Sequence, residues 1–84
     1  MRHARGEALD ELEPLLARIR ALPGLTERTR GIFYRKSRAF LHFHEDPAGL
    51  FADIRGADDG DFERLDVTQI EARERLLALA TQRI

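Results

Sequence analysis

Two histidines and one aspartate form the cluster of side chains in this sequence that most suggests chemistry. His42 and His44 are two residues apart in the segment 39–46, and Asp53 follows a turn-forming Asp46-Pro47-Ala48-Gly49. Residues i and i+2 of a β-strand project from the same face. Two imidazoles and a nearby carboxylate could therefore give three ligands to a metal ion and leave one position for water. A second hypothesis is acid–base chemistry by His42, oriented by Asp53.

The same side chains also fit a purely structural interpretation, which we favour. The loop lengths place His42 opposite Asp53, and Asp53 opposite Arg64, in a row across three strands. Such cross-strand pairs contribute ~0.2–1 kcal/mol each, and the carboxylate would raise the pKa of His42. No nucleophile, oxyanion loop or glycine-rich pocket accompanies the row. We therefore predict no catalytic residue and no cofactor, and keep His42, His44 and Asp53 as the candidate metal ligands.

The apolar pattern predicts a single α+β domain, 1–84, with residues 1–6 disordered. Leucines and isoleucines at helical spacing predict a helix over residues 7–22, ended by Pro23-Gly24, although Pro14 moves its stable start toward Asp10. Residues 25–30 are a connection or a short edge strand. Four strands are predicted at residues 31–35, 38–45, 50–55 and 62–67.

The connections fix the pairing of these strands. A two-residue turn at Lys36-Ser37 joins the first pair, and the turn at residues 46–49 makes the central hairpin. A capping box over residues 68–71 begins a second helix that runs to about Arg83. We expect Ile70, Leu76, Leu77, Ala80 and Ile84 on its buried face. Both helices are predicted to cover the same face of an antiparallel meander.

Alternation of side chains then divides the sheet into two faces. The face under the helices collects apolar residues: Ile32, Tyr34, Leu41, Phe43, Leu50, Ala52, Ile54, Leu65 and Val67. The uncovered face collects four of the five phenylalanines among charges: Phe33, Phe40, His42, His44, Phe51, Asp53, Arg55, Phe62, Arg64 and Asp66. An exposed surface so rich in aromatic side chains usually marks an interaction site. We predict a non-enzymatic binding module that forms a homodimer through this face, with a protein partner as the other occupant.

Charge adds an alternative hypothesis. Residues 28–38 carry five basic side chains and no acidic one, whereas residues 45–66 are mainly acidic, although the formal net charge is only −1. A basic hairpin tip can contact phosphates, but Asp53 and Asp66 on the aromatic face would repel them. The candidate nucleic-acid contacts are Arg28, Arg30, Arg35, Lys36 and Arg38.

Composition limits the remaining classes. The 84 residues contain no cysteine, which excludes disulfides, thiolate metal sites and cysteine nucleophiles and fits a bacterial cytoplasmic protein. No segment resembles a signal peptide or approaches the ~18 apolar residues of a membrane span. We therefore expect no membrane partner.

Three segments, Leu22–Glu27, Phe40–Asp46 and Gly49–Ile54, resemble the MmcQ/YjbR-like small bacterial proteins. The shared features are a helix that ends in a Pro-Gly turn and a meander with an aromatic-rich central hairpin. The resemblance implies an α+β double-wing fold and suggests DNA binding. The histidine-bearing strand before a glycine turn is also similar to the uncharacterised luciferase-like domain family. Neither resemblance supplies a catalytic residue.

Overall fold

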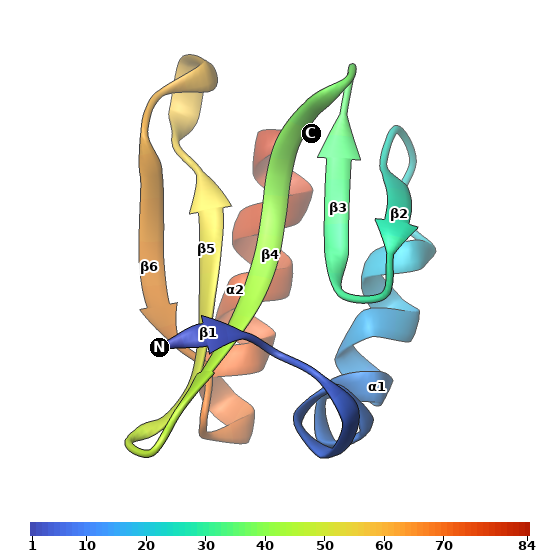
Figure 1. The fold of residues 1–84 in the computed structure, drawn as a ribbon. Helices are drawn as coiled ribbons and strands as arrows, with labels where there is room; N and C mark the ends of the chain where they lie inside the picture. Colours follow the sequence, from blue (N-terminus) through green and yellow to red (C-terminus); the bar gives the residue numbers. More distant parts are fainter.

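Two helices pack on one face of an antiparallel sheet, as the sequence predicts (Figure 1). The computed structural model describes residues 1–84. The strands are β1 (Arg2–His3), β2 (Thr26–Thr29), β3 (Ile32–Arg35), β4 (Arg38–Asp46), β5 (Gly49–Arg55) and β6 (Phe62–Asp66). The helices are α1 (Gly6–Arg20) and α2 (Ile70–Arg83), with a short 3₁₀ turn η1 (Ala57–Asp59) before β6. We call the face away from the helices the open face.

The sheet has the order β2-β3-β4-β5-β6, and β1 pairs separately with the end of β4. The meander therefore has five strands, against the three to four predicted, because residues 26–29 form an edge strand. The N-terminal residues, predicted to be disordered, include a further strand that lies in front of β4 in Figure 1, opposite the helices.

The register on the β6 side of β4 is the predicted one. Glu45 pairs with Leu50, which puts His42 opposite Asp53, and Asp53 in turn lies opposite Arg64. A tight connection and a strict two-residue repeat leave little freedom in this part of the sheet. The three residues of the predicted row therefore share the open face.

The β3–β4 hairpin departs from the prediction by one residue. The Lys36-Ser37 turn is present, with φ values of 51° and 69°, and both flanking pairs are in the expected register. The register then shifts, so that Phe33 pairs with Leu41 and Phe40 becomes the extra residue of a β-bulge. The lysine and serine adopt the positive φ angles that a type I′ turn requires, although neither is glycine.

The bulge exchanges residues between the two faces. Phe33 and Phe40, expected on the open face, are 1% and 3% exposed and belong to the core. Ile32 and Tyr34, expected under the helices, are only half-buried, and Ile32 lies opposite His42. Burying one phenylalanine side chain contributes ~1.5–3 kcal/mol, which can outweigh the local disruption of the ladder at the bulge. The assignment of these four residues from alternation alone was wrong.

The core lies between the helices and the covered face of the sheet. Leu12, Leu16 and Ile19 of α1 and Leu76 of α2 are fully buried. Helix α1 begins at Gly6, before the predicted start, and continues through Pro14. Proline removes one backbone donor from the helix, and the buried stripe on either side of it holds the helix against the sheet.

The start of α2 differs from the predicted capping box. Gln69 is the N-cap and makes no side-chain cap hydrogen bond. The Thr68 hydroxyl instead accepts a hydrogen bond from the Leu50 backbone N–H at 3.0 Å, so it is unavailable to the helix. A Cβ at Gly49 would lie 2.2 Å from this hydroxyl oxygen, which explains the glycine. Ile70, expected in the core, is 63% exposed in the first turn.

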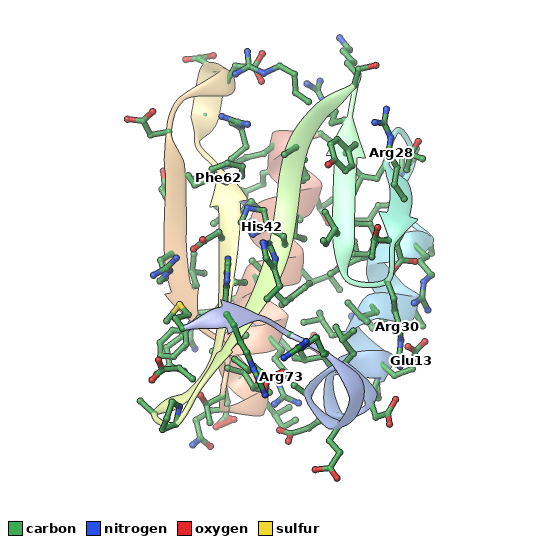
Figure 2. The ribbon with its side chains drawn as sticks, in the orientation of Figure 1. Glu13, Arg28, Arg30, His42, Phe62 and Arg73 are labelled. Atoms are coloured by element: carbon green, nitrogen blue, oxygen red, sulfur yellow. The ribbon has the colours of Figure 1, made fainter.

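One charged side chain is buried where α2 meets β6. Arg73 is 8% exposed, and its guanidinium donates to the backbone carbonyls of Val67 and Thr68 and to Glu11 of α1. These bonds satisfy the buried charge. They also connect both helices to the end of the sheet, where Figure 2 labels Arg73. No helix is long and apolar enough to cross a membrane.

Candidate metal-binding site on the open face

Three histidines meet on the open face, and we call them the histidine cluster: His3, His42 and His44. His42 and His44 are alternate residues of β4, which is held by β3 and β5. His3 comes from β1 and pairs directly with His44, so its side chain lies on the same face. All three offer a ring nitrogen within 4.8 Å of the others. This cluster contains every histidine of the chain.

The distances inside the histidine cluster are short. His42 Nδ1 and His44 Nε2 are 3.0 Å apart, close enough to share one proton in a hydrogen bond. The ring of His3 lies 4.7 Å from that of His44 and 5.4 Å from that of His42, measured between centroids. Nitrogens bound tetrahedrally to one zinc ion lie ~3.3 Å apart, given Zn–N bonds of ~2.0–2.1 Å. His42 and His44 are already near that spacing, and the exposed His3 offers a ring nitrogen within 4.8 Å of both.

Asp53 supports the histidine cluster from β5. Asp53 is 7% exposed, and its carboxylate accepts two hydrogen bonds from the guanidinium of Arg64, both of 2.7 Å. Its Oδ2 lies 3.2 Å from His44 Nε2. The predicted row is therefore present, but its carboxylate approaches the diagonal His44 and makes no hydrogen bond or ion pair with the directly opposite His42. The oxygen lies at the same His44 nitrogen that faces His42, so this carboxylate would stand beside a bound ion.

Burial governs the protonation of the two β4 histidines. It lowers the pKa of His42, and the proximity of His44 lowers it further, against the opposing effect of Asp53. Burial is also the largest cause that lowers the pKa of His44. The expectation that the polar row raises the pKa of His42 was wrong, because its desolvation outweighs the distant carboxylate. Both imidazoles are therefore neutral near pH 7, the form in which histidine ligates metals.

The hydrogen bonds from Arg64 have the opposite role for Asp53. They lower the pKa of its carboxyl group, against the effect of burial. The aspartate thus stays ionised while the adjacent imidazoles stay neutral. An ionised carboxylate next to neutral ligands favours a nearby cation.

Two phenylalanines remain on the open face of the four expected there. Phe62 is 37% exposed and packs edge-on against the His42 ring, 4.8 Å between centroids; Figure 2 shows the two side chains together. The guanidinium of Arg55 lies 4.1 Å over the Phe62 ring and donates to the backbone carbonyl of Ala39. Phe51 is half-buried. The aromatic surface is therefore smaller than predicted, and the histidines form its centre.

Asp66, the last residue of the predicted interaction face, turns back onto its own chain. Its Oδ1 accepts a hydrogen bond from the Thr68 backbone N–H at 2.9 Å. Thr68, through its side chain first and its backbone N–H second, lowers the pKa of Asp66. The carboxylate thus shapes the turn into α2 and is not part of the histidine cluster.

Most of the predicted nucleic-acid contacts are engaged within the molecule. Arg28 lies 4.4 Å over the Tyr34 ring, and Arg30 forms ion pairs with Asp10 and Glu13 of α1. Arg20 and Arg30 together lower the pKa of Glu13 to about 2. In Figure 2, Arg28 and Arg30 lie along the β2 edge, away from His42.

The other three basic residues lie at the β3–β4 turn. Arg38 is 3.7 Å from Asp59, whereas Arg35 and Lys36 make no ion pair. The five cations thus do not form one uninterrupted basic surface. Two of them remain for contacts with an external anion.

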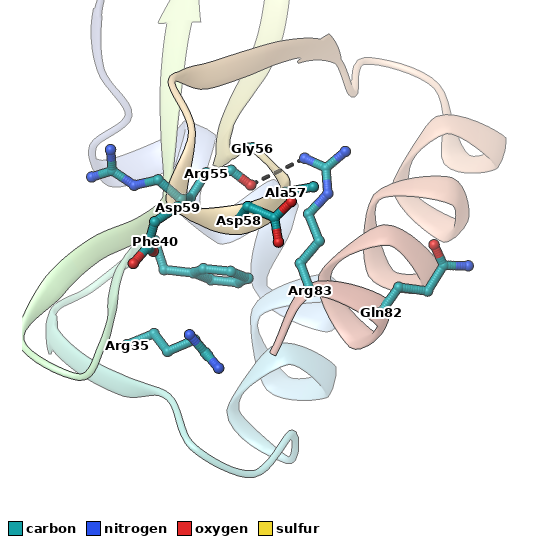
Figure 3. Close-up of a pocket in the computed structure, with 9 residues that line it drawn as sticks. All are labelled: Arg35, Phe40, Arg55, Gly56, Ala57, Asp58, Asp59, Gln82 and Arg83. Atoms are coloured by element: carbon teal, nitrogen blue, oxygen red, sulfur yellow. Dashed lines mark hydrogen bonds between the residues drawn. The ribbon is translucent and has the colours of Figure 1, made fainter.

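A separate hollow of about 360 Å³ lies at the other end of the sheet, between η1 and the end of α2 (Figure 3). Its walls include Arg35 and Asp58, neither of which has an ion pair, and Phe40 forms part of the floor. Arg83 crosses one side and donates to the backbone carbonyl of Arg55 at 3.0 Å. Charges of both signs line this hollow, and none of the three histidines does.

His3 is the site residue that sequence reasoning missed. It lies in a segment predicted to be disordered, and no spacing relates it to a residue thirty-nine positions away. The pairing of β1 with β4 brings it to the site, and that pairing is a long-range contact. The one usable signal was that the chain contains three histidines, two of them already on one strand face.

No family model, curated protein or solved structure matches the chain. The resemblance to the MmcQ/YjbR-like proteins therefore stays a prediction. The residues of the open face are the basis from which a function can be inferred.

Proposed function

We propose that this protein binds a divalent transition-metal ion, of the Zn²⁺ class, at the histidine cluster. The observation that carries the proposal is the convergence of His3, His42 and His44, with ring nitrogens within 4.8 Å of one another. Imidazole suits zinc, copper, nickel and iron better than magnesium or calcium, which prefer oxygen ligands. Three imidazoles are also a common donor set for zinc with one open position.

The surroundings of the histidine cluster favour an ion over its absence. His42 and His44 have lowered pKa values, so few protons compete with the metal at neutral pH. Asp53 supplies a fixed negative charge 3.2 Å from one ligand nitrogen, and Arg64 holds that carboxylate in place. We assign His3, His42 and His44 as ligands and Asp53 as the carboxylate that stands beside the ion and balances its charge.

Cobalt provides the direct test, because Co²⁺ replaces zinc and absorbs visible light according to its coordination. We expect the wild-type protein to bind one Co²⁺ per chain, displaceable by Zn²⁺ but not by Mg²⁺. The variants His42→Ala and His44→Ala each remove a ligand, so affinity should fall by more than the ~10–100-fold that loss of an outer partner costs.

Glu71→Gln is the matched control, since Glu71 is exposed on α2 and makes no ion pair or side-chain hydrogen bond. It should bind the ion as the wild type does. Unchanged histidine NMR shifts on addition of Zn²⁺ to the wild-type protein would reject the proposal. So would cobalt binding that survives both histidine substitutions.

A further inference from the structure

The three ligands of the histidine cluster come from two segments of unequal stability. His42 lies in the middle of β4 between β3 and β5, and His44 pairs with Phe51 of β5 on one side and with His3 on the other. His3 lies in β1, which has only two residues and pairs with one strand. Two-residue strands contribute few hydrogen bonds and open readily. The completeness of the site therefore depends on whether β1 is docked.

Few contacts hold β1 in place. The Ala4 backbone N–H donates to the Phe43 carbonyl at 2.9 Å, and the small Ala4 side chain is the segment's contribution to the core. Glu45 adds two side-chain hydrogen bonds, because its carboxylate accepts from the Arg5 backbone N–H at 2.8 Å and from the Arg2 guanidinium at 3.1 Å, and the Met1 amino group lies 3.4 Å from Asp46. Arg2 is largely exposed, and ion pairs of that kind add little stability.

The connection to α1 leaves the segment free to move. Gly6 has φ of 44°, and a Cβ placed there would meet no atom within 4 Å. Glycine tolerates both signs of φ, so the backbone can change direction here without a steric penalty. Docked, β1 passes in front of β4 on the open face (Figure 1). Undocked, it would take His3 away and uncover His44.

We infer that ion binding and docking of β1 are one linked equilibrium, with Glu45 as the positioning residue for His3. This rests on the proposed function. An ion bound by three imidazoles requires docked β1, whereas the undocked state offers only His42 and His44. The ion therefore favours docking by the ratio of its affinities for the two states, and docking raises affinity by the same ratio. The histidine cluster thus acts as a metal-dependent clasp for the N-terminal segment.

Hydrogen exchange at residues 2–5 tests the clasp directly. Saturating Zn²⁺ should slow exchange of the Ala4 and Arg5 amides at least tenfold in the wild type. In His3→Gln the ion should still shift the His42 and His44 resonances, but with lower affinity and without protection of those amides. Glu71→Gln should behave as the wild type does.

A double-mutant cycle on Zn²⁺ affinity tests the role of Glu45. Glu45→Gln removes the charge that holds Arg2 and weakens the acceptor for Arg5, yet it touches no histidine. It should lower affinity in the wild-type background and leave it unchanged in the His3→Gln background. Thermal unfolding without metal checks that both single variants are folded.

Two outcomes separate this inference from the proposed function. If the wild type binds Zn²⁺ through His42 and His44 while the exchange of residues 2–5 and the affinity of His3→Gln are unchanged, the clasp is overturned and metal binding stands. If the wild type binds no Zn²⁺, both are overturned. An equal effect of Glu45→Gln in the two backgrounds would reject Glu45 as the positioning residue.

Discussion

The two faces of the sheet are built from alternate residues of the same strands, yet they are stabilised in different ways. On the covered face, Phe43, Ala52 and Ile54 are at most 2% exposed and pack in the core with the helices. On the open face, His44, Asp53 and Arg64 form a chain of directional contacts of 2.7–3.2 Å. Apolar burial tolerates small displacements, whereas hydrogen bonds and ligand geometry do not. We therefore expect stability to depend mainly on the covered face and chemistry on the open one.

Substitution of neighbouring residues on β4 gives the largest expected difference. Phe43→Ala should lower the free energy of unfolding by ~3–5 kcal/mol, from lost burial and the cavity left behind. His44→Ala, one residue away on the open face, should cost far less. Chemical denaturation of both variants measures the contrast.

The loss from Phe43→Ala is large relative to the stability of a small domain, so Phe43→Leu provides a milder change at the same position. It should remain folded and still be less stable than His44→Ala. Equal losses at positions 43 and 44 would contradict the division between the faces.

Asp53→Asn tests the directional contacts of the open face. The amide cannot serve as a charged acceptor for Arg64, and we expect a loss of about 1–2 kcal/mol, limited by the solvent exposure of the arginine. Affinity for Zn²⁺ should also fall, by at least the ~10–100-fold that loss of an outer partner costs, because the neutral amide removes a negative charge beside the ion. Denaturation and metal titration provide the two measurements.

Asp61→Asn is the control for this change, because Asp61 is exposed and its side chain makes no hydrogen bond or ion pair. Asp61→Asn should change neither the free energy of unfolding nor the affinity for Zn²⁺. A metal affinity in Asp53→Asn equal to the wild-type value would show that the Asp53 carboxylate does not support the bound ion.

Between pH 7.5 and pH 5, lower pH should destabilise the metal-free protein through the two histidines of β4. The fold lowers the pKa of His42 and His44, so the unfolded chain binds more protons below the ordinary value of ~6.5. The stability that the neutral histidines contribute is fully present above that pH. It is lost progressively as the pH falls toward the pKa values of His42 and His44 in the folded protein. The lowered pKa of Asp53 adds a further loss at more acidic pH, below ~3.9.

Thermal unfolding between pH 7.5 and pH 5 measures this dependence. A protein carrying both His42→Ala and His44→Ala should show a flatter profile in that range. A profile that the double substitution leaves unchanged would mean that other groups control acid stability.

Phe62→Ala should have the smallest effect on stability, below ~1 kcal/mol, because the ring is already partly exposed. The same variant bears on the homodimer proposed from the sequence. Light scattering over a range of concentrations should show a dimer in the wild type and a weaker one in the variant if this face is the interface. A constant monomer mass for both proteins would remove the homodimer.

Prediction from sequence succeeded where connections are short and alternation is uninterrupted. The pairing of β4, β5 and β6, the Lys36-Ser37 turn and the placement of both helices on one face are confirmed. These features follow from loop length and from the two-residue repeat, which are local properties. The row of His42, Asp53 and Arg64 was found for the same reason.

Prediction failed where packing overrode a local pattern. The Thr68 hydroxyl was expected to cap α2, but it bonds to the Leu50 backbone because β5 approaches it. Ile70 was expected in the core, but it lies in the exposed first turn of α2. In each case the competing partner or surface lies in another element, and no local rule includes it.

The sequence by itself determined both helices, the strands β3 to β6, their order and the face that carries His42 and His44, because these depend on periodicity and turn chemistry. The tertiary structure decided two further matters. It moved Phe33 and Phe40 into the core through a single bulge, since burying two aromatic rings outweighs a regular ladder. It also brought His3 to the other two histidines through β1. A contact between residues so far apart depends on the packing of the whole chain, so it completes the site only in the folded protein.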